Sequence, residues 1–132
     1  MIRLAALLLL LPSAALAEGL PLTRGFYVDA EVGCANASNA TLALLKKDGL
    51  NSARTDCTFT GFTEQGDGTL AYTETCTDIT AGDSYDNEGR IEVLGPDSFR
   101  LSGEGWGTTF VHCPQPDLPE PWRDNDISDL LN

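Results

Sequence analysis

Two cysteines stand at equal distances from a turn signal in the stretch CTFTGFTEQGDGTLAYTETC, residues 57–76. A two-residue loop at Gly66-Asp67 would place Cys57 directly opposite Cys76 in an antiparallel hairpin. Glycine suits the first loop position of a type II′ turn, because that position needs a positive φ. Cα atoms of a non-hydrogen-bonded antiparallel pair lie about 4.5 Å apart, within reach of a disulfide. The spacing therefore predicts a hairpin closed by a Cys57–Cys76 bridge.

The same register gives the hairpin a second cross-strand pair. Gly61 would lie opposite Tyr72, whose ring would cover the backbone that the glycine leaves bare. A slip of one residue would break both this pair and the cysteine pair. β-Branched and aromatic side chains fill the remaining positions, as strands prefer. We therefore expect the whole stretch to be a two-stranded ribbon.

The beginning of the chain has the composition of a secretory signal. Arg3 precedes an apolar run over residues 4–11, and small residues end at Ala17, where cleavage is expected. The run is shorter than the about 20 residues that span a bilayer. We therefore expect residues 1–17 to be a signal peptide and the rest to be periplasmic or secreted, with no membrane insertion after cleavage. The alanine-rich signal is typical of bacteria.

An even number of cysteines in an oxidising compartment predicts disulfides. With Cys57 and Cys76 paired across the hairpin, Cys34 and Cys113 remain to form the second bridge. Cys34 follows the first predicted strand and Cys113 ends the last, so this bridge is expected to tie the two ends of the sheet together. Closing its loop of roughly 80 residues contributes about 4 to 5 kcal/mol in the chain-entropy model, against about 3 kcal/mol for the hairpin loop.

Short segments of alternating polarity recur along the chain. Residues 24–33 predict a half-buried first strand, residues 89–105 a hairpin that turns at Pro96, and residues 106–113 a last strand. Together they predict a mainly β fold over residues 18–113. We expect a single small antiparallel β-barrel or sandwich of about seven short strands, held by two disulfides.

The segment SNATLALLKKDGL fits two structures. Ser38 or Asn39 would cap a helix, with Gly49 just past its end. The same residues also fit a strand from residue 41 to residue 46, followed by a hairpin turn at Asp48-Gly49. The strand is favoured, because the neighbouring segments are strands that need partners.

The composition changes after Cys113. Residues 114–132 begin with four prolines in eight residues, which cannot join a central strand. They predict an extended, partly polyproline-like acidic arm. Its apolar anchors are Trp122, Ile127, Leu130 and Leu131.

The charge of the chain excludes one class of partner. A formal net charge of −12 repels phosphate backbones, and no basic stripe is present, so nucleic acid is not expected to bind. Such acidity favours encounter with cationic partners, although solubility alone also explains it.

Residue types that commonly act in catalysis or bind metal ions do not occur here in a combination that forms a site. His112 is the only histidine, and its neighbour Cys113 is expected to be oxidised, which removes a thiol nucleophile and leaves too few zinc ligands. Glu92 has apolar neighbours, but alternation turns it outward. We therefore expect no catalytic residues, no cofactor and no enzymatic activity.

Two acidic stretches contain oxygen ligands that would suit a weak calcium site. They are DSYDNEG, with Asp83, Asp86 and Glu88, and DNDISD, with Asp124, Asp126 and Asp129. Neither fits the EF-hand spacing. Solvated acidic loops are the favoured interpretation.

Two functions remain in view. The first is a binding module that presents loops or a barrel mouth to a small ligand or to a protein. The second is an inhibitor of a cationic secreted hydrolase such as a lysozyme, anchored by residues 102–107 or by the arm. The expected partner-binding residues are Trp106 and Trp122, and the protein is expected to be a monomer. Aromatic residues that would either line a ligand site or form the core are Phe26, Tyr27, Phe59, Tyr72, Phe99 and Trp106.

Overall fold

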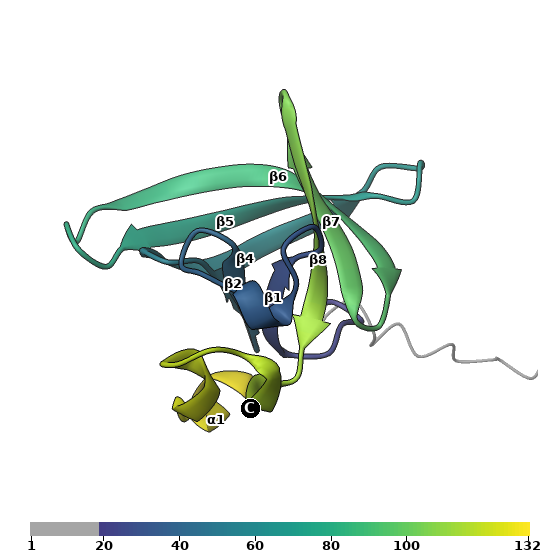
Figure 1. Ribbon diagram of the computed structural model, residues 1–132. Coiled ribbons are helices and arrows are strands. Elements are labelled where there is room, and N and C mark those ends of the chain that lie inside the picture. Colours follow the sequence, from purple (N-terminus) through teal and green to yellow (C-terminus); the bar gives the residue numbers. More distant parts are fainter. Residues whose placement is uncertain (1–18) are drawn as a thin grey trace, which may run out of the picture.

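The computed structural model describes residues 19–132, which form eight strands and four short helices (Figure 1). The predicted signal segment, residues 1–17, lies outside the described residues. The strands are β1 (Gly25–Asp29), β2 (Leu42–Lys46), β3 (Gly49–Asn51), β4 (Thr55–Glu64), β5 (Leu70–Asp78), β6 (Ser84–Gly95), β7 (Ser98–Gly103) and β8 (Trp106–Cys113). The helices are the 3-10 turns η1 (Cys34–Asn36), η2 (Gln115–Asp117) and η3 (Trp122–Asp124), and the α-helix α1 (Ser128–Leu131).

The strands form one antiparallel sheet that curls into a nearly closed barrel, in the order β3-β2-β1-β8-β7-β6-β5-β4. The outermost strands β3 and β4 approach each other where the Phe59 N–H donates to the Asp48 carbonyl oxygen at 2.8 Å. An isolated bridge between Ser52 and Thr55 continues this contact. The mainly β prediction is confirmed, with eight strands in place of about seven because β3 follows β2 as a separate short strand.

The ambiguous segment is a strand. β2 pairs with β1 and turns into β3, where Lys46 lies opposite Gly49. All five residues of β2 are buried, including Lys46 at 8% exposure. Its ammonium group pairs with Asp48 at 2.9 Å and with Asp56 at 3.2 Å, which compensates the charge that burial would otherwise leave unpaired. The helix alternative is therefore excluded.

β1 is shorter than predicted and is buried on both faces. It ends at Asp29, and residues 25–28 are all buried. Tyr27 points into the inner core with Phe99, while Phe26 and Val28 belong to a second apolar cluster on the other face. The predicted half-buried strand is thus wrong, because the C-terminal segment covers the outer face of the sheet.

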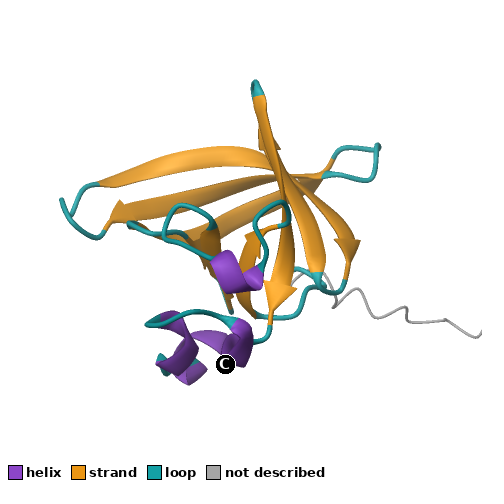
Figure 2. Cartoon of the chain, in the orientation of Figure 1, coloured by secondary structure: helices purple, strands orange, loops and turns teal. Residues whose placement is uncertain are grey.

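The C-terminal segment, residues 114–132, is not the extended arm predicted from its prolines. It folds into η2, η3 and α1 below the barrel (Figure 2). Leu118 is buried in the outer cluster, with Trp122, Ile127 and Leu131 packed around it. Proline occurs in the first turn of η2, where its missing N–H costs nothing. The apolar residues between the prolines decide the fold of this segment, because the outer face of β1 and β2 accepts them.

Removal of the Leu118 side chain tests this packing. Because Leu118 is 2% exposed, Leu118→Ala should lower the free energy of unfolding by about 2 to 4 kcal/mol, measured by urea denaturation. Leu130→Ala is the matched control, because Leu130 lies in the same segment and is 40% exposed. Equal stabilities of the two variants would show that the segment is not part of the folded core.

The β4–β5 hairpin confirms one half of the predicted register and corrects the other. Cys57 lies opposite Cys76, as predicted, but a bulge between Phe59 and Gly61 shifts the pairing, so that Phe62 lies opposite Tyr72. The bulge lets two phenylalanines three positions apart face the interior, with ring centroids 4.9 Å apart. A regular strand would have turned one of these rings outward.

The hairpin loop has three residues, one more than predicted, because the bulge shifts the pairing of β4 with β5 by one residue. Gln65 donates its N–H to the Thr69 carbonyl oxygen at 3.1 Å, so that three residues, Gly66-Asp67-Gly68, form the loop. Both glycines have positive φ, of 80° and 88°. The predicted two-residue loop is therefore wrong, although glycine is needed at the first loop position because φ is positive there, as predicted.

Both predicted disulfides are present, Cys34–Cys113 and Cys57–Cys76. The first does not tie the ends of the sheet, because β1 and β8 are neighbours in its middle and the ends are β3 and β4. It joins η1 to the end of β8 on the outer face instead. Disulfides are typical of an oxidising compartment. Within residues 19–132, none of the helices has the length and apolarity to cross a membrane.

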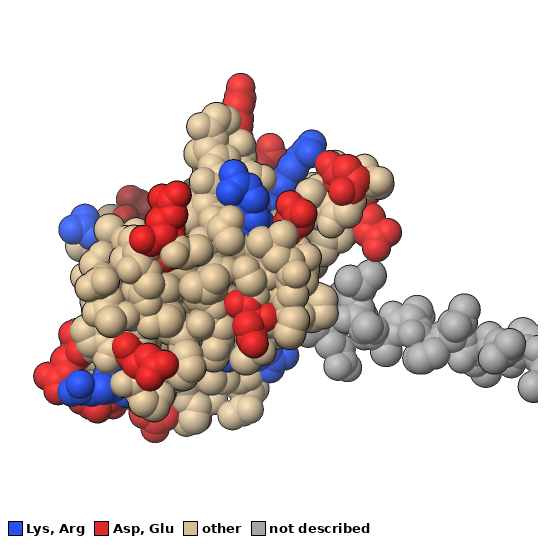
Figure 3. Space-filling view, turned by 45° about the vertical axis from the view of Figure 1, so that its right-hand side comes forward, with Lys and Arg blue, Asp and Glu red and all other residues tan. Residues whose placement is uncertain are grey.

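Acidic side chains lie at several places on the surface. Figure 3 shows red patches of Asp and Glu over the visible face, with Lys and Arg beside some of them. The chain carries 20 acidic and 8 basic residues, in agreement with the excess of acidic side chains on this face. An exposed acidic surface attracts cationic partners over a distance of about one Debye length.

Candidate functional site

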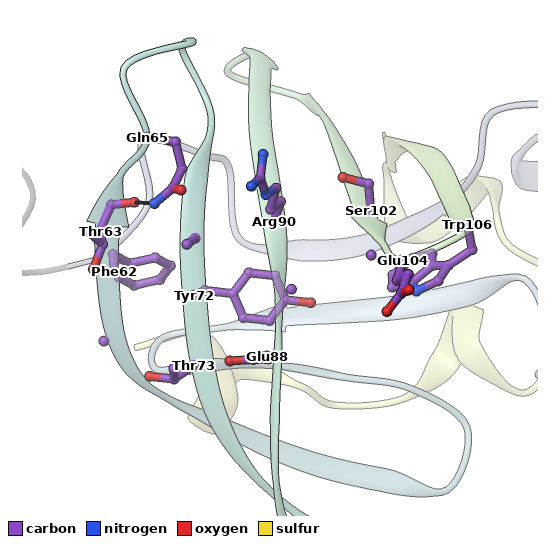
Figure 4. A pocket seen from close by; sticks show the side chains of 14 residues that line it. Phe62, Thr63, Gln65, Tyr72, Thr73, Glu88, Arg90, Ser102, Glu104 and Trp106 are labelled. Carbon is purple, nitrogen blue, oxygen red and sulfur yellow. Dashed lines mark hydrogen bonds between the residues drawn. The ribbon is translucent and has the colours of Figure 1, made fainter.

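A hollow of about 870 Å³ lies on the sheet where β4, β5 and β6 meet the tip of the β7–β8 hairpin. Figure 4 shows its lining side chains, which come from five neighbouring strands and the two hairpin loops. The residues that line it are Gly61, Phe62, Thr63, Gln65, Ala71, Tyr72, Thr73, Glu88, Gly89, Arg90, Ser102, Gly103, Glu104 and Trp106.

The centre of the lining is a row of residues that runs across the strands. Phe62 pairs with Tyr72, Tyr72 with Gly89, and Gly103 with Trp106. Gly89 and Gly103 are next to each other in the β6–β7 register, because their neighbours Arg90 and Ser102 are paired. The row therefore reads aromatic, aromatic, glycine, glycine, aromatic.

The two glycines are needed because aromatic side chains occupy the space of their missing Cβ atoms. A Cβ on Gly89 would lie 2.6 Å from the Tyr72 hydroxyl oxygen, and one on Gly103 would lie 2.3 Å from Trp106 Nε1. Tyr72 thus covers Gly89 on the next strand, and not Gly61 as predicted. Figure 4 shows the Tyr72 hydroxyl directed toward the side of the hollow where Trp106 lies.

Tyr72 stays protonated at physiological pH. Burial raises its pKa to about 12, and the nearby carboxylate of Glu74 adds to the rise. Its ring packs edge-on against Phe59, with centroids 5.6 Å apart. Tyr72 therefore presents a neutral hydroxyl to the hollow from a fixed position in the core.

Trp106 is the most exposed aromatic group of the hollow, at 50% exposure. It begins β8 directly after the two-residue turn at Glu104-Gly105, and Gly105 has a positive φ of 77°. The indole lies against the Gly103 backbone, in the space that a Cβ on Gly103 would occupy. The sequence-predicted residue Trp106 is thus an exposed, oriented aromatic group at the rim of the hollow.

Charged side chains of both signs line the hollow, and Figure 4 shows Glu104 next to the indole and Glu88 turned toward Thr73. Glu88 and Glu104 are exposed at the hollow, and Arg90 follows Glu88 by two positions on β6. The Arg90 guanidinium lies 3.8 Å from the Asp67 carboxylate in the β4–β5 loop. Asp67 also accepts hydrogen bonds from Thr69, which lower its pKa. Among the described residues, no ion pair or hydrogen bond engages the carboxylates of Glu88 and Glu104.

Trp122, the other predicted partner-binding residue, lies away from the hollow. It packs against the outer apolar cluster, and its carbonyl oxygen accepts a hydrogen bond from Gln115 Nε2 at 2.9 Å. The structure therefore does not bring Trp106 and Trp122 together. Of the other aromatic candidates, Phe26, Tyr27, Tyr72 and Phe99 are buried in the core and Phe59 is packed against it.

His112 and Cys113 point to opposite faces of β8, as alternation predicts. The His112 ring faces inward, with its centroid 5.3 Å from that of Tyr27. Cys113 is bonded to Cys34 on the outer face. Of the two acidic stretches, the one with Asp86 and Glu88 lies in β6 and not in a loop, which corrects the loop interpretation.

Glu74 is a buried carboxyl group that the sequence did not single out. It is 7% exposed on β5, and its Oε1 accepts a hydrogen bond from Asn87 Nδ2 at 3.0 Å. A carboxylate oxygen of Glu74 lies within 4.8 Å of both sulfur atoms of the Cys57–Cys76 bridge. These sulfurs are bonded to each other, so the oxidised protein offers no thiolate to a metal ion there. Alternation along β5 was the available signal, since Glu74 shares a face with Tyr72 and Cys76.

The pH dependence of stability should report on Glu74. Burial raises its pKa, and the Asn87 hydrogen bond offsets part of the rise. The stabilisation by its protonated form is complete below the ordinary pKa of 4.5 and is lost as pH rises through the folded-state pKa. Glu74→Gln cannot ionise, so its stability relative to wild type should increase between about pH 4 and pH 8. Urea denaturation across this range measures the difference. Glu92→Gln, at an exposed position on β6, is the matched control, and a flat difference for Glu74→Gln would contradict the burial of its charge.

The arrangement offers binding groups more plainly than reactive ones. An indole, a tyrosine hydroxyl, two carboxylates and a guanidinium surround a hollow that is open to solvent. These groups suit stacking, hydrogen bonding and ion pairing with a partner. Comparisons of the chain with protein-family models, with curated proteins and with solved structures found no match.

Proposed function

We propose that this protein is a non-enzymatic binding module whose recognition surface is the hollow beside Trp106, and that its partner is a cationic protein. The observation that carries this proposal is the exposed indole, held against Gly103 next to Glu104, at a hollow that Glu88 also lines (Figure 4). Tryptophan is among the residues that contribute most to protein–protein binding. The net charge of −12 would accelerate the encounter with a cationic partner.

The filled interior of the barrel favours a surface site over an internal one. Tyr27, Phe99 and Ile91 are almost completely buried at its centre, whereas the hollow beside the β7–β8 hairpin is open to solvent. A small ligand held inside the barrel would have to displace these side chains, at a cost of several contacts. A partner that covers the hollow from outside displaces only water.

Inhibition of a cationic secreted hydrolase is a second candidate. The β7–β8 hairpin, with Glu104 and Trp106 at its tip, projects from the barrel (Figure 1). A narrow projecting hairpin has the shape that can enter a substrate cleft. An acidic tip would also suit the cleft of a cationic enzyme.

Trp106→Ala tests the proposed function. In a Trp122→Phe background, Trp106 is the only tryptophan, so its fluorescence reports binding directly. Titration with poly-lysine, which contains no tryptophan, should change this fluorescence, and Trp106→Ala should weaken binding of poly-lysine and of lysozyme by about 30-fold, measured calorimetrically. Ile79→Ala is the control, because Ile79 is also exposed but lies outside the hollow.

Three outcomes separate the candidates. Binding of lysozyme with loss of its activity would favour the inhibitor, and binding without that loss would favour a module of another kind. If Trp106→Ala binds as tightly as the control, or if neither cationic probe binds, the proposed function is wrong.

A further inference from the structure

β6 is longer than β7, the strand that pairs with one of its two edges. β5 pairs with residues 84–91 of β6, whereas β7 pairs with residues 90–95. Among the described strands, residues 84–88 therefore have a neighbour on one side and none on the other, and Gly89 is the first residue that lies beside β7. Figure 1 shows β6 continuing past the point where β7 and β8 turn away from it. This free edge is five residues long, enough for an added strand of ordinary length.

The register shows which backbone groups face the free edge. The Cα atoms of Cys57 and Cys76 are 4.1 Å apart, the spacing of a non-hydrogen-bonded pair, and the Cys57 N–H donates instead to Asn51 Oδ1 at 3.1 Å. The backbone N–H and C=O groups of Cys76 therefore point away from β4 and toward β6, where Cys76 lies opposite Tyr85. Tyr85 accordingly directs its own N–H and C=O groups toward β5, and these directions alternate from residue to residue along β6. The residues whose N–H and C=O groups point away from β5, to the free edge, are therefore Ser84, Asp86 and Glu88.

The charge of the edge selects the kind of strand that can join it. Between residues 74 and 89 the sequence has five carboxylates and no Lys or Arg. Asp86 and Glu88 project on one face of the edge, where Asp86 also accepts a hydrogen bond from Thr75 at 3.0 Å. Pairing of two copies through this edge would bring like charges together, which is destabilising. A strand with Lys or Arg opposite these carboxylates would be stabilised instead.

The hollow lies at the end of this edge. Glu88, Gly89 and Arg90 form one side of it, and the hairpin tip with Glu104 and Trp106 forms another. The hollow is thus the space beside β6 that β7 leaves when it turns away. A strand added to residues 84–88 would run directly toward the exposed indole.

We propose that the free edge of β6, residues 84–88, accepts an extended segment of a cationic protein as an additional strand whose end lies against Trp106. This inference rests on the proposed function and adds the mode of recognition to it. Backbone hydrogen bonds to Asp86 and Glu88 supply affinity, and Lys or Arg side chains opposite their carboxylates supply specificity.

A synthetic peptide tests the strand addition. The probe is a capped peptide of alternating Lys and Thr, and the control peptide has N-methyl groups on two consecutive central residues, which block both of its edges. In the full chain, saturation with the probe should slow amide hydrogen exchange of Asp86 and Glu88 by about tenfold, measured by NMR. The amides of Tyr85 and Asn87 should not change, because they already bond to β5. The N-methylated peptide should bind about tenfold more weakly, because whichever edge it presents lacks one hydrogen-bond donor and carries a methyl group that obstructs the pairing.

Variants distinguish the contribution of charge. Asp86→Asn with Glu88→Gln should weaken binding of the probe, whereas Glu92→Gln, on the paired part of β6, should not. If the probe changes the Trp106 signal but leaves exchange at Asp86 and Glu88 unaltered, the strand addition is overturned and the proposed function stands. Equal binding of the probe and of the N-methylated peptide would likewise overturn the strand addition and leave the proposed function standing. If neither Trp106 nor the edge responds, both proposals fail.

Discussion

Replacement of Gly49 by alanine should open the barrel. A Cβ at this position would lie 1.7 Å from the Cys57 carbonyl oxygen and 2.7 Å from the Cys57 carbonyl carbon. Both are backbone atoms, so no side-chain rotation can relieve the overlap and β3 must move away from β4. We expect Gly49→Ala to lower the free energy of unfolding by at least about 3 kcal/mol, a large fraction of the stability of a domain of this size.

Gly95→Ala is the matched control for this variant. Gly95 lies in β6 without a positive φ, and no described atom beyond its chain neighbours lies within 4 Å of the point that a Cβ would occupy. Its replacement should change stability by less than about 0.5 kcal/mol. Urea denaturation of the two variants measures both effects. Similar stabilities would contradict the close approach of β3 and β4 that completes the barrel.

Loss of the Cys34–Cys113 bridge should be the second large effect. This bridge joins residues 79 positions apart, against 19 for Cys57–Cys76. In the chain-entropy model the longer loop contributes about 4 to 5 kcal/mol and the shorter loop about 3 kcal/mol. The double variant Cys34→Ala, Cys113→Ala should therefore be less stable than the variant that lacks the hairpin bridge.

The counterpart for this comparison is Cys57→Ala, Cys76→Ala, with unfolding followed by circular dichroism. Each bridge has at least one buried cysteine, so both variants lose packing and the difference in loop length is expected to set their order. A larger loss for the Cys57–Cys76 bridge would show that native packing around the hairpin, and not the length of the closed loop, determines the effect.

The Cys57–Cys76 bridge and most of the strands were predictable because their signals are local. Equal spacing of Cys57 and Cys76 around a glycine turn set one pair, and elimination set the other. The bulge was missed because a period of two was assumed throughout the hairpin. Phe59 and Phe62 contained the missing signal, since two core rings three positions apart cannot share a face of a regular strand.

The C-terminal segment and the hollow depend on tertiary contacts that local patterns do not contain. Prolines in residues 114–121 predicted extension, but burial of Leu118 on the outer face of β1 and β2 outweighs that preference. The row from Phe62 to Trp106 requires the register of five strands at once. Residues 84–89 carry so few apolar side chains that their sequence predicted a loop, whereas pairing with β5 makes them a strand.

The most direct test of the proposed site is an NMR titration of the ¹⁵N-labelled protein with a cationic partner. With lysozyme or poly-lysine added, the predicted result is a set of shift changes at the Trp106 indole N–H and at the amides of Glu88, Arg90 and Glu104. The indole N–H of Trp122, which packs on the outer cluster, should serve as an internal reference and stay unchanged. Changes confined to Trp122 and the C-terminal segment, or no changes at all, would contradict the assignment of the hollow as the binding site.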